Sequence, residues 1–115
     1  MRRGTRQAGP LMLAALLLLA ACTAQAPQEA AVRATPEGER LFLRFCSGCH
    51  PDGGNSRYPQ KTLSRMVLKA NGIVTVADVV ALLRNPGEGM PRFDRQTVSD
   101  AEARAIAGYV LATFP

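Results

Sequence analysis

The sequence has no tryptophan, a single histidine and few aromatic residues. Aromatic residues make up only 5% of its 115 residues, so a core built from protein alone would rest mainly on leucine, valine and alanine. A chain of this length allows one small domain and excludes a large multi-domain enzyme. Small domains with so little large apolar material usually need a disulfide, a metal or another stabilising element.

Residues 1–21 predict a bacterial export signal. Three arginines form a basic start without an acidic residue, and eleven apolar residues follow at 11–21. This run is too short for a membrane span, which needs about 20 residues. Leu-Ala-Ala-Cys at 19–22 resembles the lipobox of bacterial lipoproteins, which predicts cleavage before Cys22 and a lipid on that cysteine. The alternative is an ordinary secretory signal with a chance cysteine.

The net charge of the chain, +5, belongs largely to this signal, because removing its three arginines from the 14 basic residues leaves 11 against 9 acidic ones, a net charge of +2. No Lys/Arg stripe with interleaved aromatics remains, so nucleic-acid binding has little support. Residues 22–35 are rich in Ala, Gln, Pro, Glu and Thr and predict a flexible tether. The folded domain is expected at 36–115, on the periplasmic side of a bacterial membrane. Thr23 after the lipid-bearing cysteine favours the outer membrane by lipoprotein analogy.

Apolar spacing and start and stop signals place four helical segments in the domain. The segments are 36–46, 63–70, 75–85 and 99–114, with irregular loops at 50–60 and 85–93 between them. Thr75 and Ser99 open the third and fourth segments as N-terminal caps. In the second, helical spacing counted from Leu63 puts Met66 on the core face. Alternation with a period of two is absent, so the predicted fold class is all-α, and the chemistry is expected in the loops.

Cys46-Ser47-Gly48-Cys49-His50 has the pattern for covalent attachment of a c-type haem. Two thiols three positions apart on a helical turn can reach the two vinyl groups of the porphyrin, and the adjacent imidazole then lies under the iron. Three alternatives are weaker. A thiol-redox pair would need a βαβ setting, a zinc site about four ligands, and a disulfide between the two cysteines would leave the histidine unexplained.

The sixth position of the iron needs a different residue, because His50 is the only histidine. A methionine, a weaker donor or water must fill it. Met66 is expected in a helix core, whereas Met90 lies in a loop with two prolines and two glycines. Such a loop can bring a thioether up to a flat ring, which favours Met90 as the ligand. A surface methionine without a role is the alternative.

Successive blocks of the domain resemble a class I monohaem c-type cytochrome, most like the cytochrome c-six subgroup. The blocks are Asp-Gly-Gly-Asn at 52–55, Pro-Gln-Lys-Thr-Leu at 59–63, Asn-Gly at 71–72, Met-Pro-Arg-Phe at 90–93 and Ile-Ala-Gly-Tyr-Val at 106–110. The resemblance implies a small fold of about four helices around one covalently bound haem. It also implies that Cys46 and Cys49 form thioethers, that His50 and Met90 ligate iron, and that the Pro59 carbonyl accepts the ring proton of His50.

By the same resemblance, Gly38 and Phe42 meet Tyr109 where the first and last helices cross. A haem with histidine and methionine ligands has no open position for a substrate, so we expect a monomeric one-electron carrier rather than an enzyme. Its partners would be redox proteins that donate and accept electrons, and the lipid on Cys22 would hold it at the membrane. The alternative is a haem-based sensor or a peroxidase-like enzyme in which a small molecule displaces Met90.

Overall fold

A side-chain oxygen caps the start of each helix. The computed structural model describes residues 1, 4 and 32–115, whose helices are α1 (Pro36–Phe45), α2 (Arg65–Ala70), α3 (Val76–Arg84) and α4 (Asp100–Thr113). The capping residues are Thr35, Ser64, Thr75 and Ser99. Thr75 and Ser99 form capping boxes with the third residue of their helices, which confirms the predicted starts of α3 and α4.

The described residues contain no strand, so the all-α prediction is confirmed. A short 3-10 turn, Pro51–Gly53, follows α1. No helix within 32–115 is long and apolar enough to cross a membrane. The predicted signal, Cys22 and most of the tether at 22–35 fall outside the residues that the structure describes.

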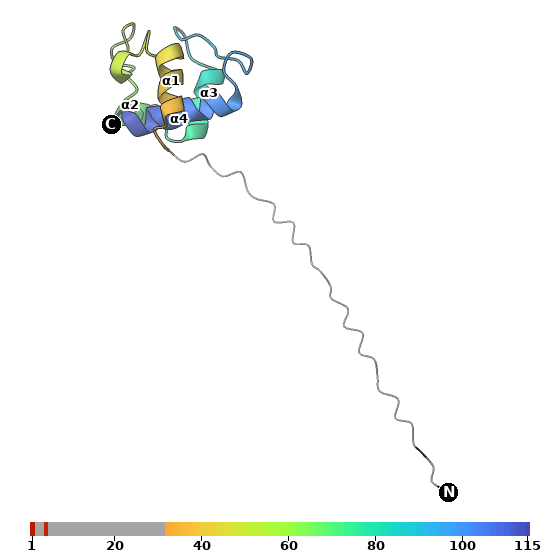
Figure 1. Cartoon of the computed structure of the whole chain (residues 1–115). Coiled ribbons are helices and arrows are strands. Elements are labelled where there is room, and N and C mark those ends of the chain that lie inside the picture. Colours follow the sequence, from red (N-terminus) through yellow and green to blue (C-terminus); the bar gives the residue numbers. More distant parts are fainter. Residues whose placement is uncertain (2–3, 5–31) are drawn as a thin grey trace.

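Helix α4 lies across α1 and α3 and forms the base of the domain (Figure 1). At its crossing with α1, a Cβ atom on Gly38 would come within 2.5 Å of the Ala105 carbonyl oxygen and 2.9 Å of the Tyr109 Cβ. The rings of Phe42 and Tyr109 pack with centroids 5.4 Å apart. The predicted contact of Gly38 and Phe42 with Tyr109 is therefore confirmed, and glycine allows the close approach.

The core is mostly aliphatic, as the composition predicts. Its buried members are Leu41, Phe42, Cys46, Leu68, Val76, Val79, Leu83, Val98, Ala103, Ile106, Ala107, Val110 and Leu111. Only one of them, Phe42, is aromatic. Because α2 contributes Leu68 alone, this core is weighted toward α1, α3 and α4.

The prediction for the second helix was wrong in one respect. Helix α2 begins at Arg65 with Ser64 as its cap, so Leu63 precedes the helix. Spacing counted from Leu63 therefore misjudges the buried face. Met66 is 78% exposed and does not belong to the core, whereas Leu68 is buried.

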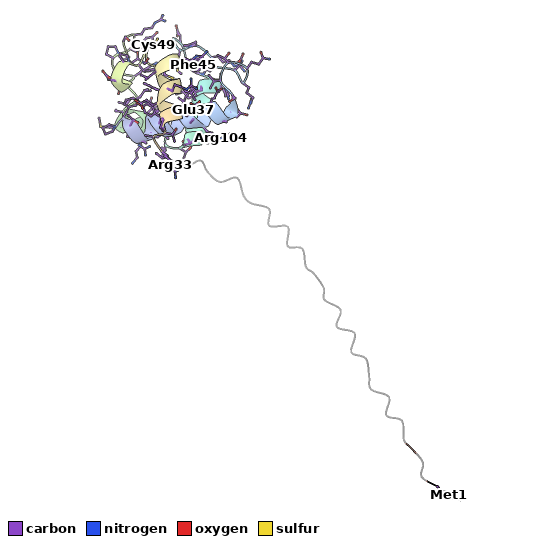
Figure 2. All side chains as sticks on the ribbon, in the orientation of Figure 1. Met1, Arg33, Glu37, Phe45, Cys49 and Arg104 are labelled. Atoms are coloured by element: carbon purple, nitrogen blue, oxygen red, sulfur yellow. The ribbon has the colours of Figure 1, made fainter. Side chains whose placement is uncertain are left out.

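The chain enters α1 at the end opposite to the cysteine motif. Arg33 and Glu37 lie at the N-terminal end of α1, and Cys49 lies beyond the other end (Figure 2). A helix of ten residues is about 15 Å long. The cysteine motif thus lies on the side of the domain opposite to the residues that precede α1.

Candidate functional site

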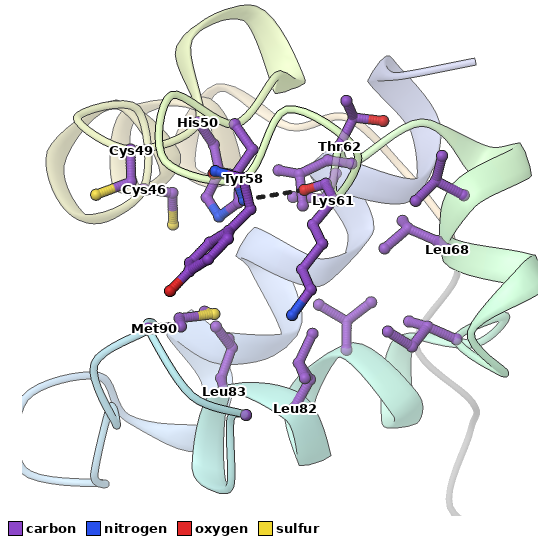
Figure 3. Close-up of a pocket in the computed structure, with 18 of the residues that line it drawn as sticks. Cys46, Cys49, His50, Tyr58, Lys61, Thr62, Leu68, Leu82, Leu83 and Met90 are labelled. Atoms are coloured by element: carbon purple, nitrogen blue, oxygen red, sulfur yellow. Dashed lines mark hydrogen bonds between the residues drawn. The ribbon is translucent and has the colours of Figure 1, made fainter.

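A cavity of about 440 Å³ lies between α1, α2, α3, α4 and the two irregular loops (Figure 3). Apolar side chains make up most of its wall, and they include Phe42, Phe45, Leu63, Val67, Leu68, Ile73, Val79, Leu82, Leu83, Ile106 and Val110. Both loops in which the sequence predicts chemistry, 50–60 and 85–93, contribute to this wall. The volume is within the range of cavities that bind a small organic molecule or cofactor.

The cysteine motif continues from the end of α1 as a single turn. The amide of Cys49 donates to the Cys46 carbonyl at 3.2 Å, and the amide of His50 donates to the same carbonyl at 2.9 Å. This turn brings both cysteines and the histidine to the wall of the cavity. Cys46 is buried and Cys49 is exposed, so one thiol lies inside the cavity and the other at its rim.

Both cysteines are free thiols, and burial raises the pKa of the Cys46 thiol to about 11. A thiol-redox pair needs a lowered cysteine pKa, because the thiolate is the nucleophile. Within residues 32–115, His, Cys, Asp and Glu side chains form no group of three that could hold a metal ion. The raised pKa of Cys46 does not favour a thiol-redox pair, and the described part of the chain offers no ready set of zinc ligands.

The ring of His50 is oriented by Gly54. Its Nδ1 lies 2.7 Å from the Gly54 carbonyl oxygen. Because a carbonyl only accepts, Nδ1 carries the proton and donates it, and in the neutral imidazole this leaves Nε2 with a free lone pair. Such a bond fixes the ring and tunes a bound metal.

The prediction that Pro59 accepts this proton was wrong. The 3-10 turn after His50 has left-handed backbone at Asp52 (φ 52°) and Gly53 (φ 77°), and this reversal brings the carbonyl of Gly54 to the ring. Pro59 is exposed and does not line the cavity.

Met90 lies across the cavity from Cys46 and His50 (Figure 3). It is half-buried and packs against the core. Met66 does not line the cavity. Of the two methionines that the sequence offers to the site, only Met90 is therefore in a position to serve it.

Tyr58 was missed by the sequence reasoning. It lines the cavity, and the cations of Arg57 and Lys61 lie 5.6 Å and 5.1 Å from its ring centroid. Asn55 holds this loop by accepting the amides of Arg57 and Tyr58 and by donating to the Lys61 carbonyl. An asparagine after two glycines is the sequence signal for such a turn.

The sequence also did not indicate that Arg84 holds the loop that bears Met90. Arg84 precedes this loop, and its guanidinium donates to the carbonyls of Phe93 and Val98 and to the Asp100 carboxylate, all of which follow Met90. A lone arginine at a helix end gives no sequence signal for these contacts, because its partners lie nine to sixteen positions away.

Comparison with known proteins gives consistent matches. Residues 33–110 match a family described as cytochrome c oxidase, cbb3-type, subunit III. Cytochrome c6 of Bumilleriopsis filiformis is 37% identical over 75 residues, which cover 65% of this chain and 86% of that protein. Cytochrome c6 of Synechocystis sp. is 39% identical over 74 residues, which cover 64% of this chain and 61% of that protein.

Solved structures agree with these relatives. OmcF, an outer membrane cytochrome F from Geobacter sulfurreducens, is 52% identical with a TM-score of 0.67, and the match covers 68% of this chain and 99% of that one. Cytochrome c6 from the diatom Phaeodactylum tricornutum is 33% identical with a TM-score of 0.62, and the match covers 66% of this chain and 88% of that one.

Proposed function

Since the chain belongs to the class I monohaem c-type cytochromes and is c6-like, we propose that it is a membrane-tethered electron carrier whose haem iron is ligated by His50 and Met90. Its family carries one covalently bound haem c, and its cytochrome c6 relatives are electron carriers rather than enzymes. The ligands, the lipid anchor and the side of the membrane are the parts that we propose.

The residues at the cavity fit a haem. The wall is mostly apolar, the two thiols lie on one turn, and the Nε2 of His50 is free to bind a metal. Cys46 and Cys49 would supply the thioether sulfurs. When bound, the haem supplies one-electron exchange at its iron.

The chain's own residues determine how that iron would behave. The bond from His50 to Gly54 holds the ring in one orientation. A thioether from Met90 would raise the reduction potential relative to a second nitrogen ligand. The apolar wall excludes water and would favour the less charged oxidation state of the haem iron. The observation that carries the proposal is the position of Met90 and His50 on facing walls of one apolar cavity.

The position of the tether supports a role at a membrane surface. A tether of residues 22–35 spans at most about 50 Å when extended and roughly 20 Å as a coil. It enters at the end of α1 that is opposite to the cysteine motif. A lipid on Cys22 would therefore leave the site facing away from the membrane and open to redox proteins. The similarity to an outer membrane cytochrome supports the outer membrane as its location.

Absorption spectra of the mature chain, produced with a haem-attachment system, test the ligation. We expect a low-spin spectrum with the iron–methionine charge-transfer band and no response to CO. Met90→Ala should lose that band and bind CO, whereas Met66→Ala should match the wild type, because Met66 is exposed and lies outside the cavity. A high-spin wild type that binds CO at once would refute the ligation and favour the sensor or peroxidase-like alternative.

A further inference from the structure

One side chain closes the loop between α3 and α4. Arg84 is the last residue of α3, and its side chain is only 14% exposed. Its Nη1 donates to the carbonyl of Phe93 at 3.0 Å and to the carbonyl of Val98 at 2.8 Å. Its Nη2 donates to Oδ1 of Asp100, the first residue of α4, at 2.7 Å. The guanidinium therefore joins the start, the middle and the end of this connection.

These contacts bracket Met90. The loop departs from α3 at Arg84 and is tied back to it at Phe93, three residues beyond Met90. The amide of Phe93 also donates to the Leu83 carbonyl at 3.0 Å. Between these ties the chain contains Gly87 and Gly89, whose backbones are freer than those of other residues. The position of the thioether thus depends on how firmly the two ends are joined.

The charge of Arg84 is balanced by Asp100. That carboxylate also accepts from Nε of Arg95 at 3.1 Å through its other oxygen, but the Arg95 side chain is 73% exposed. The two arginines together hold the pKa of Asp100 below its usual value, with the bond to Arg84 as the larger cause. A mostly buried guanidinium bonded to an ionised carboxylate is a strong, directional contact.

The arginine also carries a cost. Its Nε is buried and has no hydrogen-bond partner. An unsatisfied buried donor lowers stability, so such a group calls for an explanation. Holding the loop in one place supplies that explanation.

We propose that Arg84 is a positioning residue for Met90, which it keeps against the haem iron by tying the chain after Met90 back to the end of α3. This inference rests on the proposed ligation by His50 and Met90. Methionine is a weak iron ligand, so a loop that moves would let an external ligand take its place. Arg84 would then set how readily the sixth position opens.

Imidazole binding to the oxidised mature cytochrome tests the proposal. The displacement of Met90 is measured by the loss of the iron–methionine charge-transfer band. We expect Arg84→Gln to bind imidazole about tenfold more tightly than the wild type, which is the effect of losing about one hydrogen bond to a charged group. Arg84→Lys keeps the charge and should recover part of the difference.

Two control variants separate positioning from general stability. Arg95→Gln removes the exposed partner of the same carboxylate, and its affinity should stay within about twofold of the wild type, since exposed ion pairs contribute little. Arg65→Gln removes a bond to the Leu111 carbonyl on another side of the fold. It should lower the denaturant midpoint without changing imidazole affinity.

An Arg84→Gln protein with the wild-type affinity would overturn the proposal, and so would an equal increase in Arg65→Gln. If Arg84→Gln does not accumulate with haem, Asp100→Asn is measured instead. A rise in affinity would support the positioning role, and an unchanged affinity would refute it. A wild type that lacks the iron–methionine band would refute the proposed ligation itself, which is a distinct result.

Discussion

Gly89 lies directly against the ring of Tyr58. A Cβ atom at position 89 would come within 2.5 Å of the Tyr58 Cε2 and 2.8 Å of its hydroxyl oxygen, and Gly89 has a φ of 90° that other residues rarely adopt. This contact joins the loop after the cysteine motif to the loop that carries Met90. The two walls of the cavity therefore meet at a position that only glycine can occupy without strain.

Gly89→Ala should displace the Met90 loop. The clash and the positive φ together predict a loss of about 1–3 kcal/mol of stability and a weaker iron–methionine band. Gly87→Ala is the matched control, because a Cβ there meets nothing within 4 Å. Denaturant unfolding and the absorption spectrum measure both effects. Equal behaviour of the two variants would contradict the role of the Tyr58 contact.

Removal of the attachment cysteines should leave the chain largely unfolded. In the double variant Cys46→Ala/Cys49→Ala, the cavity of about 440 Å³ would hold no covalent haem. Helix α2 would then contribute only Leu68 to the core. Burial of few apolar residues does not offset the conformational entropy of a domain this small. Circular dichroism measures the helix content. Cys22→Ser leaves the haem-attachment motif intact and should keep the native helix content. Native helix content in the double variant would refute the prediction.

The cap of α3 should make stability depend on acid pH. Hydrogen bonds from the backbone of Thr75 and Val74 hold the pKa of Asp78 below its usual value. Because the folded pKa is depressed, the stabilisation is present above the unfolded pKa of about 3.9 and is lost as the pH falls through the folded value.

Asp78→Asn tests this dependence. It should unfold at lower denaturant than the wild type at pH 7, and the difference should shrink as the pH falls below about 4. Gln60→Ala, at an exposed position without a titratable side chain, serves as the control and should keep a constant difference from the wild type. A gap between Asp78→Asn and the wild type that is constant from pH 7 to pH 3 would rule out the cap as its cause.

Cys22→Ser should release the protein from the membrane fraction. If the cysteine carries the lipid, its loss removes the anchor while the haem motif, more than twenty residues away, is untouched. Labelling with a radioactive fatty acid and fractionation of periplasm and membranes measure the change. Thr23→Ser is the control and should stay lipidated. Labelled, membrane-bound Cys22→Ser would exclude lipid attachment at this residue.

Local patterns were sufficient for much of this protein. The turn that follows α1 presents Cys46, Cys49 and His50 together because they are sequence neighbours. Likewise, Thr75 and Ser99 cap their helices through residues three positions away. The loop of Met90 was recognised from its prolines and glycines, and it lies where that pattern indicated.

The errors arose where a role depended on contacts across the fold. Met66 fits a helical spacing, but Ser64 starts the helix later than that spacing assumed and leaves the methionine in solvent. Pro59 was assigned by resemblance, whereas the reversal at Asp52 and Gly53 brings the Gly54 carbonyl to His50 instead.

The sequence by itself determined the family, the covalent attachment motif and the helix starts, because each depends on residues within a few positions of one another. Only the tertiary structure decided which carbonyl orients His50 and how Arg84 and Tyr58 hold the loop of Met90. Those contacts join residues that lie far apart in the chain, or depend on a backbone reversal, so packing selects them and local pattern does not.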